Sequence, residues 1–399
     1  MKTSKKIFLF LSLINTIALL FLTAWFWSLP WLAGDEKIMI WATSALKLSS
    51  RETPNGEKFA LINISYDKIL IDKYDEFGFP IGNQAITDRS KLIRLLHTIN
   101  SSSDQPQYIF LDLFFDEPTE YDSALNIELL NSKNLIVSTH LNENQELIKP
   151  LFANVKNGLS DYVIGNIFEG VYKFQLFFND SLKLTPLIIN EDINDYRSIK
   201  YGPFIKIRDG FTLNHFIMNY RILQKDINDL EAGFNPTHLG ELLLLPEEDI
   251  ASFLKNKIVV IGDFYEDDMH ETLFEITAGP VILINAFLSI ENHDTVVNIF
   301  FLLIIIGVYY GVSFIAIYPE DLLENYIRKK YGKIKWVGNL TSFMSYMIIL
   351  IVTSIFCYFL FNIHINVFFL TIYLFIIEKI SHLIFKRKPR NPEISHSVL

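Results

Sequence analysis

The sequence contains a single cysteine, Cys357, and this residue lies inside an apolar stretch. Disulfide frameworks, paired-cysteine redox centres and cysteine-ligated zinc sites are therefore excluded. The sequence also lacks the GxSxG elbow, the P-loop, the GxGxxG dinucleotide fingerprint and the HExxH zinc motif. Because no side chain stands out as a nucleophile with its base, we expect a protein that is not an enzyme, with no catalytic residue, metal or cofactor.

Charge is absent from four stretches, which hold no Asp, Glu, Lys, Arg or His: Ile7–Gly34, Thr295–Pro319, Trp336–Ile363 and Ile365–Ile377. A bilayer core requires about 20 apolar helical residues, and the first three stretches have 28, 25 and 28. The fourth stretch has only 13. It reaches roughly 17 if Phe361–His364 is included and Lys379 snorkels. We therefore expect four transmembrane helices, with a tight turn at Asn362–Asn366 between the last two.

The first stretch has a second interpretation, a cleaved signal peptide. Its apolar run is longer than a signal core, and bulky Trp25, Phe26, Trp27 and Trp31 occupy its exit, where a small-x-small cleavage signal is missing. An uncleaved anchor is therefore predicted. The first three stretches contain no charged side chain, which argues against a pump or an ion-coupled carrier.

The charges are divided unevenly along the chain. Residues 35–294 carry 40 acidic and 22 basic residues, a net charge of −18, whereas the rest of the chain carries 5 acidic and 13 basic residues. Four crossings place all 13 of those bases on one side of the membrane, and the positive-inside rule identifies that side as the cytoplasm. The acidic block is then periplasmic, and both termini are cytoplasmic, in a multi-pass protein of a bacterial inner membrane. Without a basic stripe, this block does not bind nucleic acid.

These patterns predict six segments. They are a cytoplasmic stub with its anchor at 1–34, the extracytoplasmic domain at 35–294, a second span at 295–319, a basic loop at 320–335, a helical hairpin at 336–378 and a basic tail at 379–399.

The outward block alternates between strand and helix patterns. Buried-strand and amphipathic-helix patterns follow one another at Phe59–Ser65, Asp88–Asn100, Tyr108–Phe115, Asp122–Leu130 and Asn134–Thr139. A further buried strand is predicted at Lys257–Gly262, and a helix at Ile282–Ile290. Short links between these elements favour right-handed crossovers. The predicted fold is therefore an extracytoplasmic α/β domain, a mixed and mainly parallel sheet with flanking helices, joined to one transmembrane helix before it and three after it.

The middle of the block, Asn142–Pro246, has weaker patterns. Strands are expected at Lys173–Phe178 and Glu241–Leu245, and a helix near Thr212–Leu223.

The residues at four places resemble the type-two CHASE domain, an extracytoplasmic sensory module of bacterial signalling proteins. FALINISYDKIL is similar to the opening strand and acidic turn of that family, and Gly78-Phe79-Pro80 to its aromatic–proline turn. FLDLFFDEPTEYDSAL resembles the Phe-Asp-x-x-Phe-x-x-Pro stretch of the family. IVVIGDF is similar to its closing strand, and Asp268–Thr272 is similar to its Asp-x-x-x-Thr loop. Gly279 and Asn285-Ala286 match the Ala/Asn helix that follows. The family's second Trp-Pro step and arginine are absent, and Leu273 replaces a common proline. The resemblance covers about Lys58–Ile290 and implies a sensory domain between membrane spans.

Acidic residues follow three of the predicted strands. Asp67 follows the first strand and Asp116 the second, and Asp268 and His270 lie in the acidic loop after the closing strand. Ligands of open parallel sheets bind beyond the carboxyl ends of the strands. If these ends converge, they form an acidic pocket for a cation, an amine or an oxygen-ligated divalent metal. Alternatively, the acids cap turns and helices and face water.

Asp112 differs from these residues because it lies within a buried strand pattern. Its carboxylate either points into the pocket or forms hydrogen bonds in the core. Asp112 therefore joins Asp67, Asp116, Asp268 and His270 as a ligand-binding candidate.

The second span contains Gly307 and Gly311, a small-xxx-small pair that could pack two helices of a homodimer together.

The predicted cytoplasmic segments amount to 43 residues, too few for a kinase, cyclase or phosphatase. The leading hypothesis is therefore a membrane sensor that binds an unidentified periplasmic ligand or protein and signals to a separate cytoplasmic effector. The basic tail KRKPR could attract anionic membrane lipids. The alternatives are an envelope scaffold or assembly protein that docks other proteins, and a metal-dependent periplasmic hydrolase.

Overall fold

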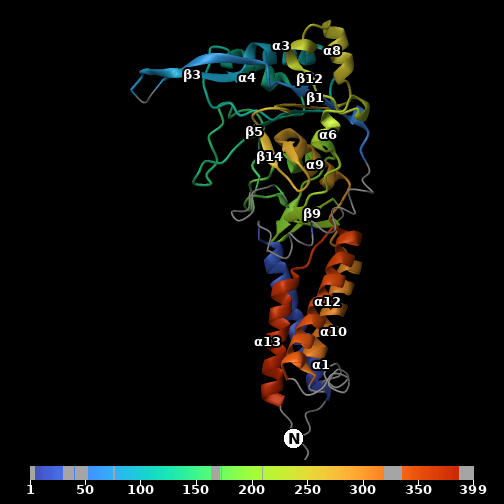
Figure 1. Cartoon of the computed structure of the whole chain (residues 1–399). Helices are drawn as coiled ribbons and strands as arrows, with labels where there is room; N and C mark the ends of the chain where they lie inside the picture. Colours follow the sequence, from blue (N-terminus) through green and yellow to red (C-terminus); the bar gives the residue numbers. More distant parts are fainter. Residues whose placement is uncertain are drawn as a thin grey trace, which may run out of the picture. The chain divides into compact units, whose positions relative to one another are not determined.

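The computed structural model describes residues 5–29, 40, 53–74, 77–162, 171, 173–208, 210–318 and 335–385. The chain forms two compact units, an α/β unit that ends at Val296 and a helical unit that contains the long apolar helices (Figure 1). Each unit is described separately below.

A six-stranded sheet forms the centre of the α/β unit. Its spatial order is β12 (Thr237–His238), β1 (Phe59–Asn63), β13 (Ile258–Gly262), β4 (Tyr108–Leu111), β5 (Leu135–Thr139) and β6 (Asn157–Leu159). Every neighbouring pair in this sheet is parallel. Strands β1, β13, β4 and β5 are buried along their whole length, as expected of parallel strands covered on both faces.

Helices cover both faces of this sheet (Figure 1). On one face lie α3 (Arg89–Ser101), α4 (Asp122–Asn131), α7 (Leu239–Leu242) and α8 (Glu247–Leu254); on the other lie α5 (Thr185–Ile193) and α9 (Gly279–Glu291). Alternate residues of β1 point to opposite sides, since Phe59 and Leu61 join the α9 core and Ala60 and Ile62 join the α3 core. Helix α9 is buried from Gly279 to Ile290, so it belongs to the interior of the unit.

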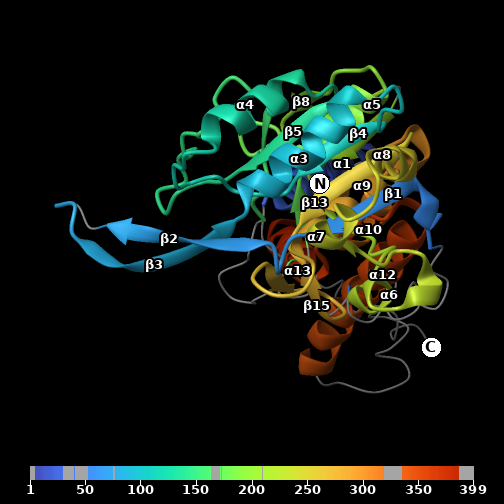
Figure 2. The same cartoon turned by 90° about the horizontal axis from the view of Figure 1, so that it is seen from above.

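Four smaller sheets complete the unit. They pair β2 (Lys68–Tyr74) with β3 (Pro80–Thr87), β7 (Lys173–Gln175) with β11 (His215–Ile217), β8 (Ile199–Tyr201) with β9 (Phe204–Ile207) and β10 (Gly210–Leu213), and β14 (Met269–Glu271) with β15 (Ile276–Ala278). The β2–β3 hairpin extends away from the central sheet (Figure 2). Short helices η1 (Gly56–Lys58), α6 (Gln224–Ile227) and η2 (Leu230–Ala232) lie in the connections.

The helical unit contains α1 (Lys5–Trp27), α10 (Ile299–Ile317), α12 (Lys335–Phe361) and α13 (Val367–Phe385). All four are long and apolar enough to cross a membrane. Polar side chains connect them: Asn15 Nδ2 donates to Ser313 Oγ at 2.9 Å and Tyr373 OH donates to Asn15 Oδ1 at 2.7 Å. Such hydrogen bonds between helices help association where lipid provides no hydrophobic driving force.

The fold class predicted from the sequence is confirmed, including one apolar helix before the α/β domain and three after it. The predicted helix after Asp88 begins at Arg89, and the Asp88 side chain accepts from Ser90 N at 3.0 Å. The fourth span is also present, but its extension was predicted at the wrong end. Asn362–Asn366 forms the turn, and α13 instead continues past Lys379 to Phe385.

Two predictions in the middle region are wrong. Glu241–Leu245 was expected to be a strand, but α7 occupies Leu239–Leu242, because Leu239, Leu242 and Leu243 recur at helical spacing and are buried together. The helix expected near Thr212–Leu223 is replaced by β10 and β11. His215–Ile217 pairs with β7 along its backbone, a non-local contact that a local pattern does not report.

Candidate functional site

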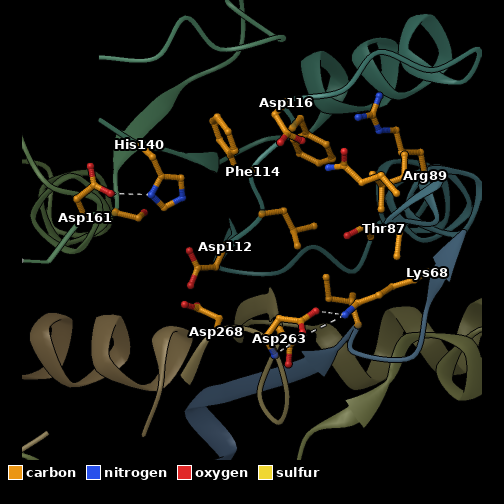
Figure 3. Close-up of a pocket in the computed structure, with 18 of the residues that line it drawn as sticks. Lys68, Thr87, Arg89, Asp112, Phe114, Asp116, His140, Asp161, Asp263 and Asp268 are labelled. Atoms are coloured by element: carbon orange, nitrogen blue, oxygen red, sulfur yellow. Dashed lines mark hydrogen bonds and ion pairs between the residues drawn. The ribbon is translucent and has the colours of Figure 1, made fainter. Parts of the chain in front are cut away.

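A cavity of about 460 Å³ lies at the carboxyl ends of the central strands (Figure 3). Residues that follow β13, β4, β5 and β6 form its walls, and residues of the β2–β3 hairpin close one side. The charged and titratable lining residues are Lys68, Arg89, Asp112, Asp116, His140, Asp161, Tyr162, Asp263, Asp267, Asp268 and His270. We refer to this space as the acidic cavity.

Asp112 follows the last residue of β4, and its backbone N–H donates to Ile261 O at 2.8 Å. Its Oδ1 accepts from Ser138 Oγ at 2.7 Å. Its Oδ2 is buried and has no hydrogen-bond partner among the described residues. Burial and the nearby charge of Asp268 raise the pKa of Asp112 to about 7. One side of this carboxyl group is therefore anchored, and the other lacks the donor that an ionised carboxylate needs.

Asp268 is held against the beginning of α9. Its backbone O accepts from Gly279 N at 2.7 Å, and its Oδ1 is 2.7 Å from His270 Nε2. A Cβ atom on Gly279 would lie 1.9 Å from Asp268 Oδ2, so any other residue at this position would force the Asp268 carboxylate to move. In Figure 3 the carboxyl groups of Asp112 and Asp268 lie next to each other. The pair thus joins the end of β4 to the first residue of α9.

His140 and Asp161 form the opposite wall. His140 Nδ1 is 2.8 Å from Asp161 Oδ1, and Asp161 Oδ2 accepts from Leu141 N at 2.6 Å. Burial lowers the pKa of His140, but the hydrogen bond to Asp161 and the charges of Asp112 and Asp268 outweigh it and raise the pKa overall. The His140 ring also meets the Phe114 ring edge-on, with centroids 5.2 Å apart.

Asp263 has a local structural role. It accepts from the backbone N–H groups of Tyr265 and Glu266 at 3.0 and 2.9 Å and from Ser65 Oγ at 2.5 Å. Burial disfavours the charged form of Asp263, but these hydrogen bonds lower its pKa overall. Lys68 pairs with Asp267 and lies 3.8 Å from Asp263. These two acids are therefore already satisfied.

The structure brings only some of the predicted ligand-binding candidates together. Asp112, Asp268 and His270 lie together in the acidic cavity, and Asp116 lines its exposed rim. Asp67 does not line it. Its carboxylate instead accepts from Lys91 Nζ at 2.5 Å and from Gly240 N at 3.2 Å, which holds α3 and α7 together.

Sequence reasoning missed His140, Asp161 and Ser138. A signal for His140 was present, because it directly follows the predicted strand Asn134–Thr139 and therefore lies at the same edge as the other strand ends. Asp161 follows β6, a three-residue strand that has no recognisable pattern. Ser138 lies inside a strand, where a serine is normally unremarkable.

Other residues that carry the resemblance to the type-two CHASE domain stabilise the loops around the acidic cavity. Asp122 accepts from Thr119 N at 2.9 Å and pairs with the nearly buried Arg89. Asn285 of α9 accepts from Arg221 N and Ile222 N at 2.7 and 3.0 Å. These contacts fix the position of α9 and of the loop after β4, on which the geometry of the cavity depends.

The arrangement suits binding of a cation or a hydrogen-bond donor. It presents one unsatisfied carboxylate oxygen, a second carboxylate beside it and the aromatic rings of Phe114, Phe115 and Tyr162. Among the described residues, no group of three or more His, Cys, Asp or Glu side chains is arranged to hold a metal ion.

Comparisons with known proteins give one family. A model of the CHASE2 domain matches residues 16–352. No curated protein and no solved structure matches the chain. The match extends beyond Lys58–Ile290, the part covered by the resemblance, and includes all of α10 and parts of α1 and α12. Since it covers most of the sequence, the chain belongs to the CHASE2 domain family of extracytoplasmic sensory domains, here combined with apolar helices typical of a multi-pass membrane protein.

Proposed function

We propose that this protein is an inner-membrane sensor whose periplasmic domain binds an organic cation in the acidic cavity. The observation that carries the proposal is the buried Oδ2 of Asp112, which has no partner among the described residues and faces the Asp268 carboxylate. The protein would act by binding rather than by catalysis. Both termini would lie in the cytoplasm, where a separate effector receives the signal.

The chemistry of the cavity defines the ligand class. Placing the buried Asp112 oxygen beside a second carboxylate costs free energy, and a positive charge between the two carboxylates offsets that cost. An ammonium group also donates several hydrogen bonds, as Asp112 Oδ2 requires. The Phe114, Phe115 and Tyr162 rings favour an organic cation over a bare metal ion, because ring faces attract ammonium groups. A small aliphatic amine or diamine fits this description and the cavity volume of about 460 Å³.

Helix α9 provides the route for the signal. Asp268 contacts Gly279, the first residue of α9, and the chain continues from Glu291 to the beginning of α10 at Ile299. A ligand that draws Asp268 toward Asp112 therefore acts directly on α9. It shifts the receptor between states only if it binds one state more tightly than the other.

The test uses the full chain in lipid nanodiscs, with butane-1,4-diamine as the probe. We expect the diamine to raise the midpoint of thermal unfolding and to slow hydrogen exchange of the α9 amides, Gly279–Glu291. Asp112→Asn and Asp268→Asn should each reduce binding by about tenfold or more, because a charge-assisted hydrogen bond contributes about 1.5–3 kcal/mol.

The matched control is Asp249→Asn, which removes an exposed carboxylate from α8 outside the cavity. It should leave diamine binding unchanged. Equal loss of binding in all three variants would show that the diamine is attracted to the acidic domain in general. This outcome would contradict the proposal that the acidic cavity is the binding site. Protection by magnesium chloride but not by the diamine would instead favour the metal-dependent alternative.

The β2–β3 hairpin favours protein docking as a second candidate function. It extends from the sheet (Figure 2), and Leu70 and Ile81 are 70% and 58% exposed. Large exposed apolar side chains on a two-stranded ribbon are typical of protein contacts. Cross-linking of the full chain in its native membrane distinguishes this role. An envelope scaffold should lose a stoichiometric partner on Leu70→Ser with Ile81→Ser, whereas the sensor should retain its diamine response.

A further inference from the structure

A second cavity, of about 440 Å³, lies in the α/β unit at the end of α9. Apolar side chains form much of its wall, including Leu176, Phe211, Phe216 and Ile290. Its polar lining consists of Arg208, Thr212, Ser289, His293 and Thr295, and the described lining residues include no carboxylate. This composition is unusual for a domain predicted to carry a net charge of −18. We refer to this space as the arginine cavity.

One edge of the Arg208 guanidinium group is unsatisfied. Its Nε and Nη2 atoms are both buried and have no hydrogen-bond partner among the described residues. Nη1 is 3.5 Å from His293 Nε2, and the guanidinium group lies 5.6 Å from the centroid of the Tyr196 ring. Nε and Nη2 together form the planar fork that binds two oxygens of a phosphate or carboxylate.

Two hydroxyl groups in the same cavity are also unsatisfied. Ser289 and Thr295 are 3% and 5% exposed, and Ser289 Oγ and Thr295 Oγ1 have no partner in the described part of the chain. A buried hydroxyl without a hydrogen bond destabilises the fold. Arg208, Ser289 and Thr295 thus all line one cavity and all have unsatisfied donors.

The end of α9 does not supply the missing acceptors. The carbonyl oxygens of Leu288, Ser289 and Ile290 already accept from the backbone N–H groups of Asn292, Asp294 and His293. Among the described residues no acceptor is paired with Arg208 Nε, Arg208 Nη2 or the Ser289 and Thr295 hydroxyls, so a bound molecule that carries acceptors could satisfy these donors together.

We propose that the arginine cavity binds a phosphate group carried on an apolar molecule. The Arg208 fork would hold two phosphate oxygens, and the Ser289 and Thr295 hydroxyls would donate to the others. The apolar walls would contact the rest of the ligand. The shared chemistry fits a phospholipid headgroup and also a soluble phosphate ester.

The position of the cavity in the sequence favours the lipid. Val296, a lining residue, precedes the first residue of α10 by three positions, and three residues span at most about 11 Å. This site is independent of the acidic cavity, and the proposal stands whether or not an amine binds there.

The test measures lipid retention by native mass spectrometry of the full chain purified in detergent. The probes are phosphatidylglycerol and soluble glycerol 3-phosphate. We expect Arg208→Gln to reduce bound phosphatidylglycerol by about tenfold, since it removes a bidentate charge-assisted contact. Lys206→Gln is the matched control, because it removes one exposed positive charge from β9, two residues before Arg208 and outside the cavity. It should have little effect.

Thr295→Val provides a second readout that does not depend on charge. Replacing a buried, unpartnered hydroxyl with a methyl group should raise the unfolding midpoint in phosphate-free detergent and lower phosphatidylglycerol retention. Displacement of the lipid by millimolar glycerol 3-phosphate would identify a soluble ester as the ligand, and failure to displace it would identify the lipid. Equal losses in Arg208→Gln and Lys206→Gln, or unchanged retention in both Arg208→Gln and Thr295→Val, would overturn the proposal.

Discussion

The acidic cavity and the arginine cavity have similar volumes but opposite chemical deficits. The first contains a buried carboxylate oxygen without a donor, and the second contains buried N–H and O–H groups without an acceptor. Folded proteins satisfy nearly all buried polar groups. The unsatisfied atoms of these two cavities therefore support the proposed ligands of opposite charge, and they are more informative than the lining composition.

The largest expected effect concerns Gly279, which contacts Asp268 of the acidic cavity. Gly279→Ala should destabilise the α/β unit by about 1–3 kcal/mol, because its Cβ would force the Asp268 carboxylate to move. Thermal unfolding of the full chain in detergent measures this change. Gly210→Ala in the arginine cavity is the control, since its Cβ would come no closer than 3.9 Å to another group. Equal effects of the two substitutions would show that the tight contact at α9 is not real.

Asp112→Asn should stabilise the protein at high pH. Burial and Asp268 raise the pKa of Asp112 from 3.8 to about 7, so the folded state binds this proton more tightly than the unfolded state. Stability therefore falls as the pH rises from about 4 through 7. The variant should be more stable than the wild type by about 2 kcal/mol at pH 8 and nearly equal to it at pH 4.

Unfolding midpoints of both proteins between pH 4 and pH 9 check this prediction. Asp249→Asn should retain the pH profile of the wild type. A variant that is less stable than the wild type at pH 8 would mean that Asp112 has an unrecognised partner in the folded protein.

Removal of the hydroxyl group that donates to Asp112 and removal of one in the arginine cavity should have opposite effects. Ser138→Ala removes the donor to Asp112 Oδ1 and should destabilise the fold by about 1 kcal/mol. Thr295→Val removes a hydroxyl that has no partner among the described residues and should stabilise the ligand-free fold by about 1 kcal/mol. Midpoints compared in one phosphate-free buffer test the contrast, and shifts of the same sign would contradict it.

The smallest expected effect is that of His140→Gln. Its raised pKa, due to Asp161 and the other acids despite burial, means that the protonated form stabilises the fold at low pH. This contribution is lost as the pH rises through the pKa of the folded state. The variant should therefore lose about 0.5–1 kcal/mol at pH 5.5 and less at pH 9. Urea unfolding at both values checks this, with His97→Gln, an exposed histidine, as the control.

The main elements could be predicted because each depends on a local pattern. Buried parallel strands such as β13 are continuous apolar runs, and α3 has a capping aspartate and a helical repeat. Strands β7 and β11 could not be predicted as a pair, since their pairing joins residues about 40 positions apart in the sequence. Backbone pairing between such distant segments is decided by the tertiary structure.

The acidic cavity could be predicted only in part. The rule that ligands bind at strand ends leads to Asp112, Asp268 and His270, but it also leads to Asp67, which forms an ion pair with Lys91 instead. The sequence left open whether the Asp112 carboxylate faces a pocket or forms hydrogen bonds in the core. In the structure, Oδ1 accepts a hydrogen bond from Ser138, and Oδ2 has no partner among the described residues. The arginine cavity is formed by residues scattered from Leu176 to Val296, and no spacing in the sequence connects them.

Helix α9 begins at the acidic cavity and ends at the arginine cavity. Its 13 residues form a rod of about 20 Å. If both proposed ligands bind, a displacement of this rod by one of them would change the affinity for the other, and thermodynamic linkage would make the two changes equal in size. The phospholipid content of the membrane would then set the amine concentration at which the receptor responds, and a saturating amine would change the affinity for the lipid by the same factor.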